Sequence, residues 1–188
     1  MRLVLASSSP RRLDLLARIG VTPDAVVPAE IDETPTPNEL PIAHARRLAA
    51  AKAAAVAQPG DLTLAADTVV AVGRRILPKT ETEEEARAAL RLLSGRRHRV
   101  HSAVTIVDAE GRARHRLSSS IVTFKLLSDA ELAAYLASGE WRGKAGGYAI
   151  QGRAGALIRA LSGSYSGVVG LPLFETRALL LACGYPLS

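Results

Sequence analysis

The pattern of apolar and polar positions predicts strands and helices that alternate along the whole chain. Short apolar runs rich in β-branched residues are typical of strands, whereas apolar residues that recur every three or four positions are typical of helices. The expected strands are residues 2–6, 24–29, 62–72, 74–77 and 156–161, with 96–127 as a long hairpin turning at 108–111. The expected helices are residues 10–20, 37–60, 83–95, 129–139 and 170–184. Such alternation is typical of the α/β class.

Capping residues indicate where several of these helices begin. Ser9 stands at an N-cap position, where its hydroxyl is expected to accept a backbone N–H. Thr82 with Glu85, and Ser128 with Glu131, have the spacing of capping boxes. The glycine-rich segment 143–155 is expected to be a loop with close backbone approach.

Length and composition favour a single domain, residues 1–188, which could divide into two small lobes. Apolar residues make up 48% of the chain, but none of the runs approaches the roughly 18 residues of a membrane span. The short apolar start does not resemble a signal peptide, and the single cysteine, Cys183, excludes an internal disulfide. A cytoplasmic protein is therefore expected.

The net charge of +6 favours a polyanionic partner such as a nucleotide, a phosphorylated metabolite or a nucleic acid. Arginine dominates the basic residues, and only Lys52, Lys79, Lys125 and Lys144 are lysines. Where lysine persists in such a chain, a compact ammonium can be specifically required. This points to Lys52, Lys79 and Lys144.

The segment "LASSSPRR", residues 5–12, joins the first strand to the first helix. Free backbone N–H groups and the helix dipole favour an anion at such a corner. Ser7 and Ser9 add hydroxyl donors, and Arg11 and Arg12 can each grip phosphate oxygens with two hydrogen bonds. The alternative is an ordinary N-cap followed by solvated arginines.

Carboxylates occur at two further places. Asp67 stands within the apolar run "AADTVV", where an ionised side chain needs a partner, and a divalent cation is suitable. The alternative is an aspartate whose carboxylate is satisfied at a turn or at the end of a strand. Glu30, Asp32 and Glu33 follow the second strand and, taken alone, are more typical of a solvated acidic loop.

Three other residues, two lysines and a glutamine, have two interpretations each. Lys52 and Lys79 could bind phosphate or be solvated charges. Gln151 could contact a nucleobase edge or cap loop backbone, because its amide both donates and accepts. The histidines have no metal-binding spacing and are expected at the surface or on strands. They are His44, His98, His101 and His115.

Seven segments follow one another in series from residue 5 to 172: "LASSSPRR", "IDET", "RLAAAKA", "AADTVV", "LLSGRRHRV", "KAGGYAIQG" and "SGSYSGVVGLP". Together they resemble the Maf family, also called septum-formation inhibitor proteins. The resemblance implies a mixed central sheet in two lobes with a cleft between them, similar to inosine triphosphatases. It also implies hydrolysis of the α–β phosphoanhydride of a nucleoside triphosphate, with a divalent cation, Mg²⁺ or Mn²⁺, as cofactor.

The resemblance also implies a role for each residue that falls within a motif. Asp67 matches the proton acceptor that activates water, and Glu33 matches an acidic residue near the metal. The positions that match base selection are Arg11, Thr68 and Gln151. The positions that match basic residues around the triphosphate are Arg12, Lys52 and Lys79.

"ADTVV" and "AGGYAIQG" resemble the branch of the family that acts on dTTP and UTP. Uracil and thymine present an acceptor–donor–acceptor edge that Gln151 can partly satisfy, whereas cytosine leaves a polar group unpaired. Two positions depart from the family pattern. "LPKT", Leu77 to Thr80, replaces "LGKP" and could present Lys79 differently, and Ser102 stands where the family usually has threonine.

Two other functions are compatible with the sequence. One is a pool-cleaning pyrophosphatase for modified or non-standard nucleotides, some of which share the imide edge. The other is a nucleotide- or nucleic-acid-binding regulator of cell division, but 4% aromatic residues leave few platforms for stacking on single strands. The family suggests a homodimer, and a membrane partner is not expected.

Overall fold

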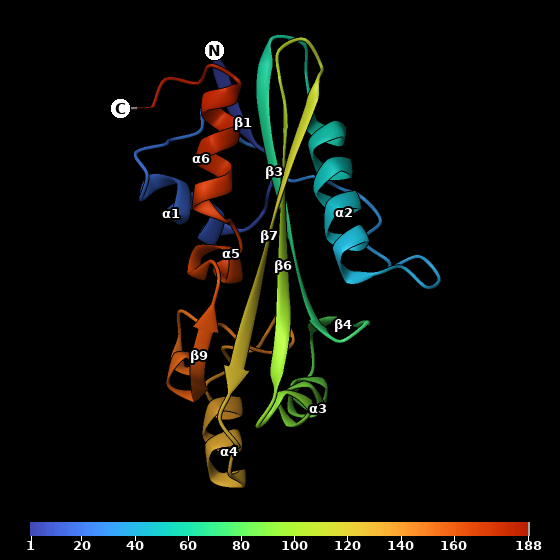
Figure 1. Ribbon diagram of the computed structural model, residues 1–188, viewed down its shortest axis with the longest axis vertical. Helices are drawn as coiled ribbons and strands as arrows, with labels where there is room; N and C mark the ends of the chain where they lie inside the picture. The colour runs from blue at the N-terminus through green and yellow to red at the C-terminus, as the bar shows by residue number, and fades with distance from the viewer. Residues whose placement is uncertain (188) are drawn as a thin grey trace.

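The computed structural model describes residues 1–187 and has a mixed central sheet with strand order β2-β1-β3-β6-β7-β9, to which β4 adds beside β3 (Figure 1). The strands are β1 (Arg2–Leu5), β2 (Ala25–Val26), β3 (Asp61–Val72), β4 (Arg75–Leu77), β6 (Arg97–Val107), β7 (Ala113–Phe124) and β9 (Ile158–Ser162). β1 runs parallel to β2 and β3, and the remaining pairs are antiparallel. A second small sheet pairs β5 (Lys79–Thr80) with β8 (Lys144–Ala145). The predicted mixed α/β class is confirmed.

Helices cover both faces of the central sheet. They are α1 (Pro10–Ala17), α2 (Pro41–Val56), α3 (Glu83–Leu93), α4 (Asp129–Ala137), α5 (Tyr165–Val169) and α6 (Leu173–Ala182), with a 3₁₀ turn η1 (Arg153–Leu157). α2 packs on β3 and β6, whereas α5 and α6 pack on β6 and β7 from the other face (Figure 1). Within residues 1–187, each helix is too short or too polar to cross a membrane.

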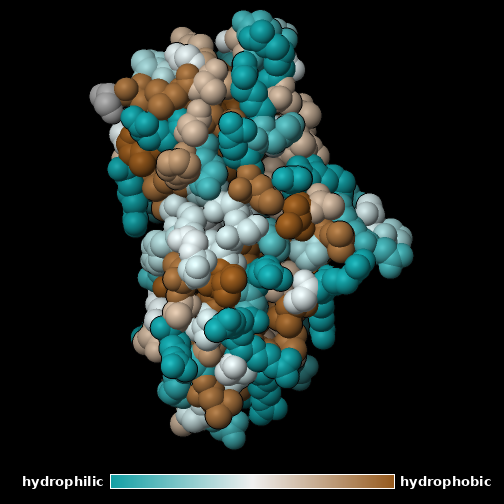
Figure 2. All heavy atoms as spheres, in the orientation of Figure 1, coloured by the Kyte–Doolittle hydropathy of each residue, from teal (hydrophilic) through white to brown (hydrophobic). Residues whose placement is uncertain are grey.

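The core has two main groups of buried apolar side chains, toward opposite ends of the long strands. One surrounds α3 and α4 and includes Phe124 and Trp141, and the other surrounds α1 and α6 and includes Leu64 and Leu179. Each fully buried side chain of this size contributes about 1.5–3 kcal/mol to folding. Figure 2 shows only small, separated groups of apolar side chains on the outer face in this view.

The long strand β3 has an open stretch along one edge. β1 pairs with residues 61–64 and β4 pairs with residues 70–72, so residues 65–69 have a strand partner only on the β6 side within the described chain. Asp67 and Thr68 lie in this open stretch. Because side chains alternate along a strand, Asp67 faces α2 and Thr68 faces α5, so groups from both faces can converge beside them.

Several predicted elements differ in extent from those observed. The helix expected at 37–60 begins at Pro41, because Asn38 adopts a left-handed conformation (φ 61°) in the preceding turn. The strand expected at 24–29 is only two residues long, and Pro28 has no N–H to extend the ladder. Part of the expected loop 143–155 forms β8 and η1, and the strand expected at 156–161 begins at Ile158 because η1 occupies the residues before it.

The expectation for the histidines is wrong at one position. His44 lies on the helix α2 and is only 5% exposed. The Glu39 carboxylate, 2.8 Å from its Nδ1, compensates the burial of the ring. His98, His101 and His115 lie on strands, as expected.

Candidate active site

A cavity of about 320 Å³ opens beside the unpaired stretch of β3. It brings together all of the predicted site residues, although they come from distant parts of the chain. They are Ser7, Ser9, Arg11, Arg12, Glu33, Lys52, Asp67, Thr68, Lys79 and Gln151. Asp32, by contrast, is not part of the lining, and its carboxylate accepts the backbone N–H of Thr34.

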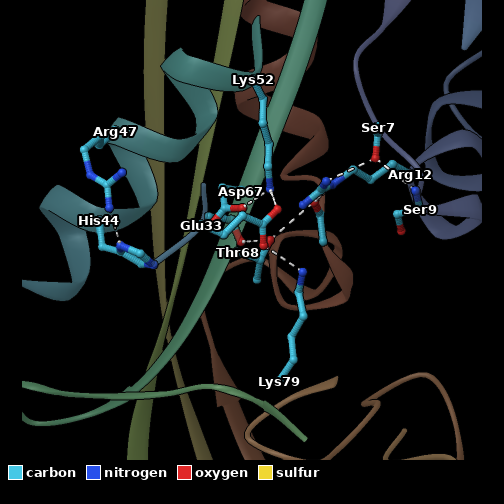
Figure 3. A network of polar contacts seen from close by, with 12 residues as sticks. Ser7, Ser9, Arg12, Glu33, His44, Arg47, Lys52, Asp67, Thr68 and Lys79 are labelled. Atoms are coloured by element: carbon cyan, nitrogen blue, oxygen red, sulfur yellow. Dashed lines mark hydrogen bonds and ion pairs between the residues drawn. The ribbon is translucent and has the colours of Figure 1, made fainter. Parts of the chain in front are cut away.

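A buried ammonium joins the two carboxylates of the cavity. Lys52 extends from α2, and its Nζ lies 2.6 Å from Asp67 Oδ1 and 2.6 Å from Glu33 Oε1 (Figure 3). The Lys52 residue is only 7% exposed, so its interpretation as a solvated surface lysine is wrong. The partner that the buried Asp67 requires is therefore present in the chain itself.

Glu33 also binds Lys79, whose Nζ lies 2.8 Å from Glu33 Oε2. Burial raises the pKa of Glu33, but hydrogen bonds from Lys52 and Lys79 outweigh it and hold this pKa at about 2. Glu33 is therefore ionised at neutral pH. Lys79 reaches the cavity from β5 even though proline precedes it, so the departure at "LPKT" does not direct its ammonium elsewhere.

The strand–helix corner is built around the Ser7 hydroxyl. Ser7 Oγ accepts hydrogen bonds from the Ser9 N–H and from Arg12 Nη1, each at 3.1 Å. Since both contacts use its lone pairs, its own proton is free to be donated. Ser9 occupies the N-cap position of α1, but the expected side-chain cap is not formed, and the backbone N–H of Arg12 donates instead to the Ser9 carbonyl at 3.1 Å. Arg12 is held in place by donating from Nε to the Gly170 carbonyl, 2.9 Å away.

The cavity contains five cationic side chains and two carboxylates. Burial lowers the pKa of Arg11 and of Lys144, and it lowers the pKa of Arg12 despite partial compensation by Asp67 and Glu33. These shifts indicate cations removed from water without full pairing. The cavity is therefore suited to a ligand that carries several negative charges.

A second network holds the loop that carries Glu33. Glu39 accepts hydrogen bonds from Arg47 Nε (2.7 Å) and Nη2 (2.9 Å), and Arg47 Nη2 also donates to the Thr34 carbonyl (3.0 Å). Hydrogen bonds from Arg47, more than the opposing effect of burial, hold the pKa of Glu39 well below its ordinary range. Glu39 and Arg47 were not predicted as site residues, because nothing in their local pattern indicates that the loop folds back onto α2.

Two further lining residues were not predicted as site residues. Lys144 was marked only by the scarcity of lysine, and Tyr148 forms a wall of the cavity. The Tyr148 hydroxyl lies 2.6 Å from His98 Nε2, and their rings pack edge to face. His98 is 3% exposed, and burial lowers its pKa from 6.5 to about 4.

The buried His98 predicts a loss of stability in mild acid. Between pH 6.5 and 4 the unfolded chain binds a proton at this residue that the folded chain does not, so stability falls as the pH falls. We expect the free energy of unfolding to drop by about 2 kcal/mol between pH 6.5 and about pH 5 from this residue. Urea unfolding followed by circular dichroism at several pH values measures it.

The matched variants are His98→Gln and His115→Gln. The first should flatten the pH dependence, leaving the smaller contribution of His101, whose pKa is also lowered by burial. The second should leave it unchanged, because His115 is exposed. An unaltered slope in His98→Gln would show that the acid sensitivity arises elsewhere.

Together, the fold and the site define an α/β protein with a strongly cationic cleft around paired carboxylates. The chain matches the family model Maf, described as Maf-like protein, over residues 2–183, and it therefore belongs to the Maf family.

The relatives of the chain include proteins named dTTP/UTP pyrophosphatase. The one from Caulobacter vibrioides is 62% identical over 185 residues, covering 97% of this chain and 96% of its own. The one from Rhodospirillum rubrum is also 62% identical, covering 97% of this chain and 88% of its own. A solved nucleoside-triphosphatase / dITP/XTP pyrophosphatase from Mycobacterium abscessus is similar with a TM-score of 0.46 and 17% identity, over 99% of this chain and 95% of that one. This last likeness is too remote to bear on activity.

Proposed function

We propose that the chain is a nucleoside triphosphate pyrophosphatase that acts on dTTP and UTP. The observation that carries this proposal is the Glu33–Lys52–Asp67 cluster inside a cavity with an excess of cations. A triphosphate supplies the missing negative charge. The two relatives of 62% identity, both named dTTP/UTP pyrophosphatase, support the choice of substrate.

We assign the triphosphate to the cationic side of the cavity. The residues proposed to bind it are Ser7, Ser9, Arg12, Lys52 and Lys79, with Lys144 added from its place in the lining. Ser7 has a free hydroxyl proton, and the cations offset the charge that develops on the phosphate oxygens. Arg11, Thr68 and Gln151 are proposed to contact the base.

Asp67 is proposed to accept the proton of the attacking water. Its Oδ1 is held by Lys52, whereas no hydrogen bond to its Oδ2 is found among residues 1–187. The water oxygen forms a bond to the α-phosphorus and its proton passes to Asp67, while the α–β anhydride bond breaks and pyrophosphate leaves with the electron pair of that bond. The nucleoside monophosphate remains.

The donor set fits a divalent cation of the Mg²⁺ or Mn²⁺ type. Glu33 and Asp67 each lie 2.6 Å from the same ammonium, so their oxygens are close enough to share a cation with phosphate oxygens. Among residues 1–187 there is no cluster of three or more acidic, histidine or cysteine ligands, so substrate oxygens or water would complete the coordination. When bound, such an ion would offset charge on the phosphates.

The direct test is product analysis with dTTP and UTP in the presence of Mg²⁺ or Mn²⁺. Equal amounts of pyrophosphate and nucleoside monophosphate are expected. Release of orthophosphate alone would contradict the proposed bond cleavage, and tight binding without turnover would favour a regulatory binding protein. The two-lobe division, the cytoplasmic location and the homodimer remain predictions.

A further inference from the structure

Ser102 lies directly beneath Thr68 and does not line the cavity. The two residues are opposite each other on β6 and β3, so their hydroxyls meet on the same face of the sheet at 3.1 Å. Ser102 is 1% exposed, and its Oγ lies 2.5 Å from the Gly167 carbonyl. Thr68 is part of the cavity lining.

The proton positions in this cluster follow from the chemistry of its members. A carbonyl oxygen can only accept, so Ser102 donates its single proton to Gly167. In the contact between the two hydroxyls, Thr68 must then be the donor. The other group near Thr68 Oγ1 is the Gly170 carbonyl at 3.4 Å, which is also an acceptor and already receives Arg12 Nε. Thr68 therefore directs its proton into the protein and only lone pairs toward the cavity.

From this geometry we propose that Ser102 is a positioning residue that sets substrate specificity through Thr68. This inference rests on the proposed function, which places the base beside Thr68. A hydroxyl that can only accept pairs well with the imide N–H of uracil or thymine. It opposes the ring nitrogen of cytosine, which is itself an acceptor at that position.

Gln151 cannot supply this discrimination alone. Its side chain is exposed, and within residues 1–187 no hydrogen bond fixes its amide. An amide can turn over and exchange its donor and acceptor, so it can adapt to either base edge. Thr68 cannot adapt without leaving the buried Ser102 oxygen short of a partner, which is unfavourable.

The experiment compares Ser102→Ala with Ser102→Thr, using UTP and CTP as substrates. The kcat/KM for pyrophosphate release is measured for each nucleotide, and the inhibition constant of CTP against UTP hydrolysis is measured as well. In Ser102→Ala the preference for UTP over CTP should fall on the order of tenfold, because the Thr68 hydroxyl can rotate into the cavity. Ser102→Thr keeps the hydroxyl and should retain the preference.

Ser120→Ala is the matched control. Ser120 is also a buried serine, and its Oγ anchors the same segment through the N–H (2.9 Å) and carbonyl (3.4 Å) of Ser164 without touching Thr68. If the preference depends only on holding this segment, Ser120→Ala should lower it equally. Equal losses in the two alanine variants, or an unchanged preference in Ser102→Ala, would overturn the proposal.

If Ser102→Ala does not fold, the preference for UTP over CTP is measured in Thr68→Val instead. Removal of the accepting hydroxyl should lower the preference for UTP at least as much, and a retained preference would overturn the proposal. The proposed function is tested separately by the wild-type protein. If that protein releases pyrophosphate from UTP and only the preference is unaffected by these substitutions, the specificity inference alone fails.

Discussion

Asp67→Asn is expected to lower kcat for dTTP and UTP by at least about 10²-fold and by up to about 10⁴-fold, the range that a general base typically contributes. The amide keeps the size of the carboxylate, and its carbonyl oxygen can still accept from Lys52. What is lost is the basic oxygen that takes up the proton of water. Nucleotide binding should therefore change much less than turnover.

The matched control for this prediction is Asp61→Asn. Asp61 is the first residue of the same strand, is 9% exposed and pairs with Arg2 at 2.7 Å, outside the cavity. Turnover should be unaffected there. Steady-state pyrophosphate release and calorimetric nucleotide binding give kcat and Kd for both variants, and wild-type turnover in Asp67→Asn would refute its role.

Glu33→Gln separates proton transfer from metal binding. Glu33 is proposed only to help hold the cation, so its variant should recover activity as Mg²⁺ or Mn²⁺ is raised. Asp67→Asn should not recover, because excess cation does not replace a base. Recovery of Asp67→Asn at high metal concentration would instead assign Asp67 to metal binding alone.

Structural features that depend on residues close together in the chain could be predicted from the sequence. The capping boxes at Thr82 and Ser128 both form as expected, because each depends on residues three positions apart. The hairpin of β6 and β7 also forms, since its alternation and turn lie within one continuous segment. Asp67 could be singled out because an isolated carboxylate in an apolar strand needs a partner.

Features that depend on distant contacts could not be predicted in the same way. Arg12 is oriented by the carbonyl of Gly170, far along the chain, and no local pattern indicates this pair. The open stretch of β3 exists only because β1 and β4 pair with its two ends. The resemblance to the Maf family predicted that Glu33 and Lys52 belong to one site, whereas the residues alone favoured solvated charges for both.

Lys52→Met is expected to lower kcat by about 10²- to 10³-fold, comparable to the loss of one donor from a preorganised charge-stabilising site. Lys52 is buried between Glu33 and Asp67, so its removal leaves two carboxylates without the ammonium that lies between them, and only Glu33 keeps a partner, Lys79. The hydrogen bond that most lowers the pKa of Glu33 is then lost, so Glu33 should keep its proton to a higher pH. The acid limb of the pH–rate profile should move upward.

Lys79→Met provides the matched comparison, since both lysines bind Glu33 but differ in burial. The Lys79 side chain is 59% exposed and that of Lys52 is 9% exposed, so solvent screens the first far more than the second. Lys79→Met should therefore lower activity less and leave the pH profile nearly in place. Thermal unfolding of both variants, with Lys52→Arg to retain the charge, separates lost catalysis from lost stability. Equal losses in the two methionine variants would mean that only the total charge of the cleft matters, and that the buried position of Lys52 contributes nothing.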